Sequence, residues 1–146
     1  MLVFNKILLM LHFLGLAMGL SAFFANMTML GLLKKAAPPE KPVLGRFPPL
    51  MARIGRIGLG ILIVTGVTMV FTRWAGFAAM PWTFDVKMAA VVLLAIVIGY
   101  MQVLEIRMRK ADPPAMGALL ARMENLGKMA GTLAVLAIIF AVLTFN

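Results

Sequence analysis

The chain has no cysteine, one histidine and only five acidic residues among its 146 residues. Without cysteine it cannot form a disulfide, a thiolate metal site or a cysteine nucleophile. A single histidine also excludes a haem held by two histidines of the same chain. Paired intramembrane acids, an HExxH motif and a phosphate-binding loop are missing too, so the sequence assigns no hydrolytic activity. Redox chemistry would have to come from a bound cofactor.

Apolar residues are abundant: 63% of the chain is hydrophobic, 13% is charged, and the mean hydropathy is +1.02. Soluble domains carry about 25% charged residues. The apolar residues gather in long runs that predict four membrane helices, at about 3–34, 51–72, 84–106 and 126–145. The predicted fold is an all-α integral membrane four-helix bundle forming one domain, residues 1–146. We interpret the first run as a retained helix rather than a cleaved signal peptide.

The net charge of +9 comes from cations that lie mainly in two connections between the apolar runs. Eleven basic residues lie in or beside these two connections: Lys34, Lys35, Lys41, Arg46, Arg53, Arg56, Arg107, Arg109, Lys110, Arg122 and Lys128. Three basic residues lie on the other side: Lys6, Arg73 and Lys87. The positive-inside rule predicts that both long loops are cytoplasmic and both termini outside, in a bacterial inner membrane. The expected partner of the cations is the lipid bilayer and not nucleic acid.

Proline pairs punctuate the connections. Pro38-Pro39 and Pro48-Pro49 predict an ordered or extended loop before the second helix, and Pro113-Pro114 predicts a break before the fourth. The second half of that last connection, after the break, has a sequence compatible with helix. Trp74 and Trp82, in the short link between the second and third helices, form an aromatic pair typical of the headgroup level.

One side of the first helix combines polar and small residues at steps of three and four: His12, Gly15, Gly19, Ala22 and Asn26. Small residues on a membrane helix mark the close approach of another helix or of a flat cofactor. We therefore predict that this face points into the protein. The second helix has a comparable face with Gly55, Gly58, Leu62, Thr65 and Met69, for which close helix packing and a planar cofactor slot are both open.

Three roles are open for His12: a metal or haem ligand, a structural hydrogen-bonding group, or a proton or substrate contact. An ionisable residue inside the membrane is a functional candidate by default, because burying it costs free energy. If His12 binds haem, the fourteen methionines offer the sixth ligand. The depth of His12 favours Met69 or Met88.

Charge also enters the predicted third helix near its start, at Asp85 and Lys87. Asp85 in the first turn suits the positive end of the helix dipole. Lys87 has two interpretations: an interfacial lysine that extends its side chain to the surface, or a partner for a cofactor carboxylate such as a haem propionate.

Three segments, "LHFLGLAMG", "RIGLGILIVTGVTM" and "FDVKMAAVVLLAIVIGYM", resemble small bacterial four-helix membrane proteins of the copper-resistance-protein-D type and of the HemJ type of protoporphyrinogen oxidase. The resemblance rests on a histidine in the first helix, a Thr-Gly step in the second and an F/H-x-V-K start of the third. It implies that His12 binds haem b and that Lys87 corresponds to the family's lysine. The HemJ type usually has further histidines around its third helix, and this chain has Asp85 and Tyr100 in that region instead. The resemblance therefore does not by itself imply protoporphyrinogen oxidation.

Two functions are therefore predicted as alternatives. In the first, the protein binds haem b through His12, assisted by Gly15, Gly19, Met69 and Lys87, in a redox or assembly role. In the second, it is a non-catalytic accessory subunit that packs against a larger membrane complex or a second copy of itself. No enzymatic activity is assigned by the sequence.

Overall fold

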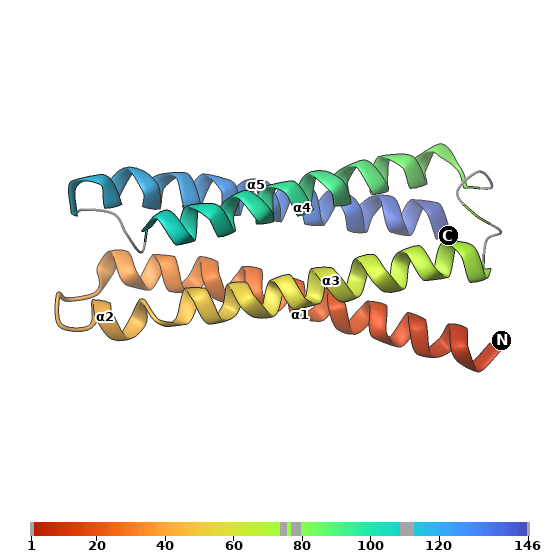
Figure 1. The fold of residues 1–146 in the computed structure, drawn as a ribbon, viewed down its shortest axis with the longest axis horizontal. Helices are drawn as coiled ribbons and strands as arrows, with labels where there is room; N and C mark the ends of the chain where they lie inside the picture. Colours follow the sequence, from red (N-terminus) through yellow and green to blue (C-terminus); the bar gives the residue numbers. More distant parts are fainter. Residues whose placement is uncertain (1, 74–75, 77–79, 109–112, 146) are drawn as a thin grey trace. The chain divides into compact units, whose positions relative to one another are not determined.

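The computed structural model describes residues 2–73, 76, 80–108 and 113–145 (Figure 1). The regular elements are α1 (Leu2–Lys35), α2 (Lys41–Leu44), α3 (Phe47–Arg73), α4 (Trp82–Met108) and α5 (Pro113–Phe145). Four candidate spans, Val3–Lys35, Lys41–Thr72, Trp82–Met108 and Gly117–Thr144, are long and apolar enough to cross a membrane. The predicted all-α membrane fold with four spans is confirmed, and the chain is a multi-pass membrane protein.

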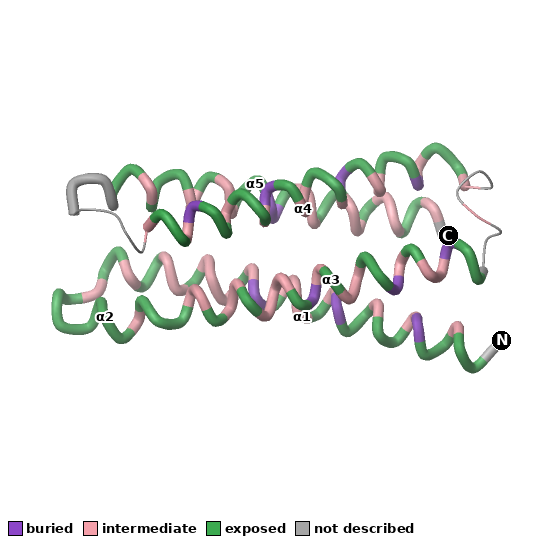
Figure 2. Tube along the Cα trace, viewed as in Figure 1, coloured by how far each residue is buried: buried purple, intermediate pink, exposed green. Residues whose placement is uncertain are grey.

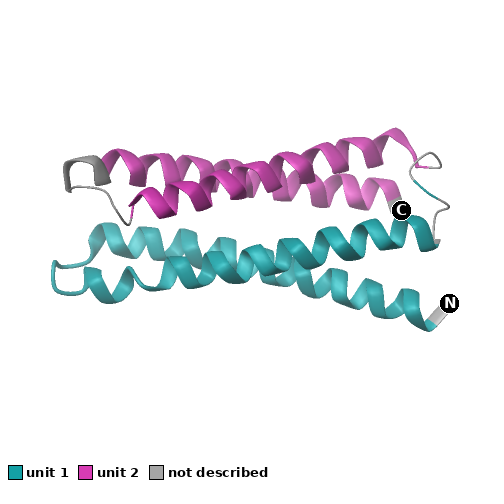
Figure 3. Cartoon of the chain, viewed as in Figure 1, with its two compact units in different colours: residues 1–79 teal, residues 80–146 magenta. Residues whose placement is uncertain are grey.

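The chain divides into two compact units, Met1–Ala79 and Met80–Asn146 (Figure 3). In the first unit α1 packs against α3, and in the second α4 packs against α5. Each unit is a helical hairpin and is described by itself. The expectation of one domain over residues 1–146 stays a prediction.

Two of the long helices begin earlier than the sequence predicts. α3 starts at Phe47 and includes Pro48-Pro49 in its first turn, and α5 starts at Pro113 instead of near residue 126. Proline is compatible with the first turn, because the N–H groups there have no partner within the helix. The prediction that these prolines lie outside the helices was therefore wrong. The first loop, predicted to be ordered or extended, also contains a short helix, α2.

The link between the units begins at the end of α3. The N–H of Gly76 donates to the carbonyl of Val70, one of the last carbonyls of that helix. Gly76 has φ of 106°, which favours glycine because a Cβ is strained there. Trp82 opens α4, is 69% exposed, and makes an edge-to-face contact with Phe140 at 6.3 Å between ring centroids. Trp74, Arg109 and Lys110, which were also considered in the sequence, lie outside the described residues.

The buried residues of each hairpin form a narrow stripe with a seven-residue repeat (Figure 2). On α1 the stripe includes Leu8, Gly15 and Ala22, and on α4 it includes Ala90, Val97 and Leu104. A repeat of seven residues, or 3.5 per turn, is that of two helices wound around each other with a left-handed supercoil. His12 lies beside this seam on α1, four residues after Leu8, which places its side chain toward α3.

Candidate functional site

The site that the sequence predicts around His12 is formed by α1 and α3. Nδ1 of His12 lies 2.9 Å from Oγ1 of Thr65, which is 53 residues later in the chain. Thr65 is 4% exposed and is the one polar residue among the fully buried side chains of the described chain. The face of α1 that contains His12 and the face of α3 that contains Thr65 were predicted separately. In the structure these two faces contact each other. Of the three roles open for His12, the hydrogen-bonding one is realised in the structure.

The Thr65 hydroxyl determines the direction of this hydrogen bond. Its oxygen lies 2.6 Å from the carbonyl oxygen of Ile61 and 3.4 Å from that of Leu62, on its own helix. The shorter contact is the one that the single hydroxyl proton makes. The oxygen then accepts from His12, which assigns the proton to Nδ1. In this neutral tautomer the ring's lone pair is on Nε2, the atom through which an imidazole can bind a metal.

Backbone contact between two glycines brings α1 and α3 together one turn away from His12. A Cβ built on Gly58 would lie 2.7 Å from the carbonyl oxygen of Gly15 and 3.0 Å from the nitrogen of Gly19. A Cβ built on Gly15 would in turn lie 2.8 Å from the carbonyl oxygen of Gly58. Such distances leave no room for a planar group between the helices at this level. Close helix packing is thus the role of these glycines.

Small residues continue the seam on either side of the glycine contact. A Cβ on Gly55 would lie 3.2 Å from Cβ of Ala22, which is 4% exposed. At the other end, a Cβ on Gly66 would lie 3.3 Å from Cε1 and 3.8 Å from Nδ1 of His12. The imidazole edge therefore packs directly on the backbone of α3. The contact of Gly66 with the histidine was not predicted from the sequence.

Two asparagines on α1 extend the polar side of this helix. Oδ1 of Asn26 and Oδ1 of Asn5 are buried and have no hydrogen-bond partner among the described residues. Asn5 was not singled out from the sequence. Its signal was present, since Asn5, His12, Gly19 and Asn26 follow one another at intervals of seven and therefore share one position of the helical repeat.

Met69, the predicted second ligand on α3, is half-buried and lies one turn beyond Thr65 along the helix. It belongs to the same unit as His12. Met88 and Lys87 belong to the other unit, Met80–Asn146. Nζ of Lys87 lies 5.8 Å from the ring centroid of Phe84, a buried residue one turn earlier. Asp85 is in the first turn of α4, as predicted. Because His12 and these two residues belong to different units, the joint role of His12, Lys87 and Met88 stays a prediction.

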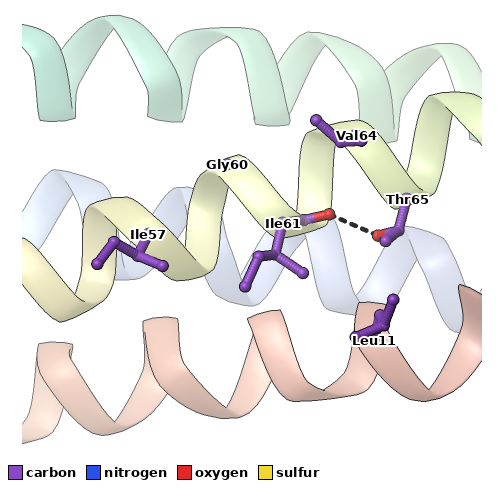
Figure 4. Close-up of a pocket in the computed structure, with 6 residues that line it drawn as sticks. All are labelled: Leu11, Ile57, Gly60, Ile61, Val64 and Thr65. Carbon is purple, nitrogen blue, oxygen red and sulfur yellow. Dashed lines mark hydrogen bonds between the residues drawn. The ribbon is translucent and has the colours of Figure 1, made fainter.

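A shallow apolar groove runs along α3 and includes Thr65, the hydrogen-bond partner of His12 (Figure 4). Its volume is about 350 Å³, and its lining comes from α3 apart from Leu11: Leu11, Ile57, Gly60, Ile61, Val64 and Thr65. The Thr65 hydroxyl turns to the carbonyl of Ile61 (Figure 4), so the groove presents almost pure hydrocarbon. A molecule bound there would touch Thr65, the hydrogen-bond partner of His12.

The described residues contain no group of three or more His, Cys, Asp or Glu side chains that could hold a metal ion. Comparisons with models of known protein families, with curated proteins and with solved structures found no match. The resemblance to the copper-resistance-protein-D and HemJ types therefore rests on the three sequence segments alone.

Proposed function

We propose that this multi-pass protein of a bacterial inner membrane binds haem b through Nε2 of His12, in a redox or cofactor-assembly role. The observation that carries the proposal is the His12–Thr65 contact of 2.9 Å. Histidines that bind metals almost always donate their other ring N–H to a neighbouring acceptor, which fixes the tautomer and the ring orientation. Thr65 supplies that acceptor within the membrane.

The groove beside Thr65 provides the apolar environment that such a ligand requires. Cofactor sites are mostly apolar, occupy about 300–1,000 Å³ and contain a few placed polar groups. A porphyrin would approach from the groove along α3, because the contact of Gly15 with Gly58 closes the space between the helices. Gly15 and Gly19 then act by holding α1 close to α3. When bound, haem supplies one-electron chemistry, and Met69 is the proposed sixth ligand within this unit.

The remaining predictions belong to the same proposal. If the four candidate spans cross the membrane one after another, the first and third connections lie on the same side. The excess of basic residues at these connections supports the proposal that this side is the cytoplasm. Lys87 would then lie near the outer surface, where a lysine can pair with a haem propionate.

Visible spectroscopy tests the proposal. The protein is expressed with added haem precursor, purified in detergent and recorded with and without dithionite. We expect a Soret band in the wild type that His12→Ala abolishes and that Thr65→Val weakens. Loss of the group that accepts a hydrogen bond from a metal-binding histidine, here the Thr65 hydroxyl, lowers metal affinity about 10–100-fold. Thr68→Val is the matched control, since the Thr68 hydroxyl donates to the carbonyl of Val64 on its own helix at 2.8 Å. A colourless wild type, or a band that survives His12→Ala, would refute haem binding at this residue.

A second candidate is favoured by a different observation. The backbones of Gly15 and Gly58 are in contact and His12 is hydrogen-bonded within the hairpin, as in a subunit whose polar groups serve packing alone. Such a protein would be a non-catalytic accessory subunit of a larger membrane complex, or a homo-oligomer. Such a protein would purify without colour in mild detergent, and the particle mass would exceed that of one chain. The substitution His12→Gln would preserve this assembly as long as the glutamine keeps the hydrogen bond to Thr65.

A further inference from the structure

Positive charge is concentrated at the end of the first unit where α1 and α3 are joined. Residues 34–56 include six basic residues and one acidic residue, a net charge of +5. Lys34 and Lys35 lie in the last turn of α1, where cations stabilise the negative end of the helix dipole. Lys35, Lys41 and Arg46 are exposed. We call residues 34–56 the basic hairpin end.

Large apolar side chains are exposed among these cations. Val43 is 63% exposed, Phe47 is 43% exposed and Leu50 is 53% exposed. A surface that alternates exposed basic and exposed apolar side chains suits the boundary between headgroups and acyl chains, where the charges meet phosphates and the apolar groups enter the hydrocarbon. An aqueous surface would leave Val43 and Phe47 in water without any gain.

The length of the helices places this end at the headgroup level. α1 has 34 residues and therefore spans about 50 Å, against about 30 Å for the hydrocarbon core. Part of the hairpin must lie in the headgroup region or beyond it, even when tilted. Arg53 lies six residues after Phe47, the first residue of α3, or about 9 Å along the helix axis. The cations are thus distributed through a depth similar to that of one headgroup layer.

We propose that the basic hairpin end binds anionic phospholipid headgroups, through Lys35, Lys41 and Arg46 beside the inserted side chains of Val43 and Phe47. The corresponding connection of the second unit serves as a comparison for the basic hairpin end. Its connection and flanks, residues 105–128, have five basic and three acidic residues, a net charge of +2. Both connections have cations and exposed apolar side chains, the latter at Ile106 and Leu120 in the second, so the higher net charge distinguishes the first. This binding does not depend on haem.

Native mass spectrometry of the purified full-length chain in an uncharged detergent measures lipid affinity directly. The probes are phosphatidylglycerol and phosphatidylcholine with identical acyl chains. The test variant is Lys35→Gln/Lys41→Gln/Arg46→Gln. The matched control, Lys6→Gln/Arg107→Gln/Arg122→Gln, removes three exposed cations elsewhere. Circular dichroism and thermal unfolding verify that both triple variants keep their helices.

The wild type is expected to prefer phosphatidylglycerol, and the test variant to lose at least about tenfold in affinity for it. A basic side chain near an anionic surface contributes about fivefold per cation. The control is expected to lose less than about threefold, and phosphatidylcholine binding is expected to be unchanged in both. Equal affinity of the wild type for the two lipids would overturn the proposal. Equal losses in the two variants would overturn it as well, since the attraction would then be that of net charge alone.

Discussion

Gly15 and Gly58 touch through their backbones: a Cβ added to Gly58 would lie 2.7 Å from the carbonyl oxygen of Gly15. The side chains of Met18 and Leu62 lie beside this backbone contact. Van der Waals contact between helices drives their association in a membrane, where lipid tails are as apolar as the side chains. The contact between these two residues is therefore expected to determine how firmly the first hairpin holds together.

Gly58→Ala is expected to destabilise the first hairpin by about 1–3 kcal/mol, the usual cost of forcing atoms into a packed interior. Gly60→Ala is the matched control on the same helix, because a Cβ there meets nothing within 4 Å. The control is expected to be neutral or slightly stabilising, since alanine favours helix over glycine. Thermal unfolding in detergent compares the two. Equal melting temperatures for both variants would contradict the close contact.

Gly66→Ala is expected to displace the imidazole of His12. The new Cβ would lie 3.3 Å from Cε1, so the ring has to shift by a few tenths of an ångström against its bond to Thr65. If haem is bound, its Soret maximum or its affinity should change without loss of the pigment. In the apoprotein, the imidazole proton resonances of His12 should shift. The same variant should leave the oligomeric state and the helicity of the protein unchanged.

Asn26→Leu is expected to stabilise the protein. A buried polar atom without a partner costs about 1–3 kcal/mol, and Oδ1 of Asn26 has none among the described residues. Ser21→Leu, at an exposed position of the same helix, controls for the general effect of added hydrocarbon. A melting temperature that falls in Asn26→Leu while Ser21→Leu has no effect would show that Asn26 has a partner in the working protein.

The second hairpin can be tested by cross-linking, because the natural chain has no cysteine. The hydroxyl oxygens of Thr83 and Thr144 lie 2.9 Å apart, at the start of α4 and near the end of α5. Thr83→Cys/Thr144→Cys is expected to form a disulfide on mild oxidation, measured as protection from maleimide labelling. Thr83→Cys/Val142→Cys should stay labelled, since Val142 is 58% exposed on α5. Labelling of both pairs to the same extent would refute the packing of α4 on α5.

Much of the first hairpin could be predicted from the sequence, because the relevant signals are periodic and local. The three- and four-residue spacing of His12, Gly15 and Ala22 identified the packed face of α1. Thr65 and Gly58 were likewise placed on one face of the second span. The periodicity did not reveal that Thr65 is the residue opposite His12, because that depends on how far the two helices are shifted along each other.

Other features were beyond what local sequence signals can provide. Helix after the Pro113-Pro114 pair was compatible with the sequence, but the pair itself was placed outside α5, because proline breaks a helix in its interior yet suits its first turn. The proposed cooperation of His12 with Lys87 joins residues of two units, and no periodicity within one helix specifies such a pairing. The place of Asn5 on the polar side of α1 was not predicted, because Asn5 is related to His12 only by the seven-residue interval.

The hydrogen bond between His12 and Thr65 has a further consequence for the alignment of α1 with α3. A seam of small and apolar residues that repeats every seven positions can slide by one repeat and still pack. Sliding α1 by one repeat would put Gly19 or Asn5 opposite Thr65 and would leave the imidazole facing another part of α3. In hydrocarbon, where no water replaces a lost partner, such a shift is penalised. The hydrogen bond of His12 thus favours one alignment of α1 with α3 over the shifted ones, whatever else His12 binds.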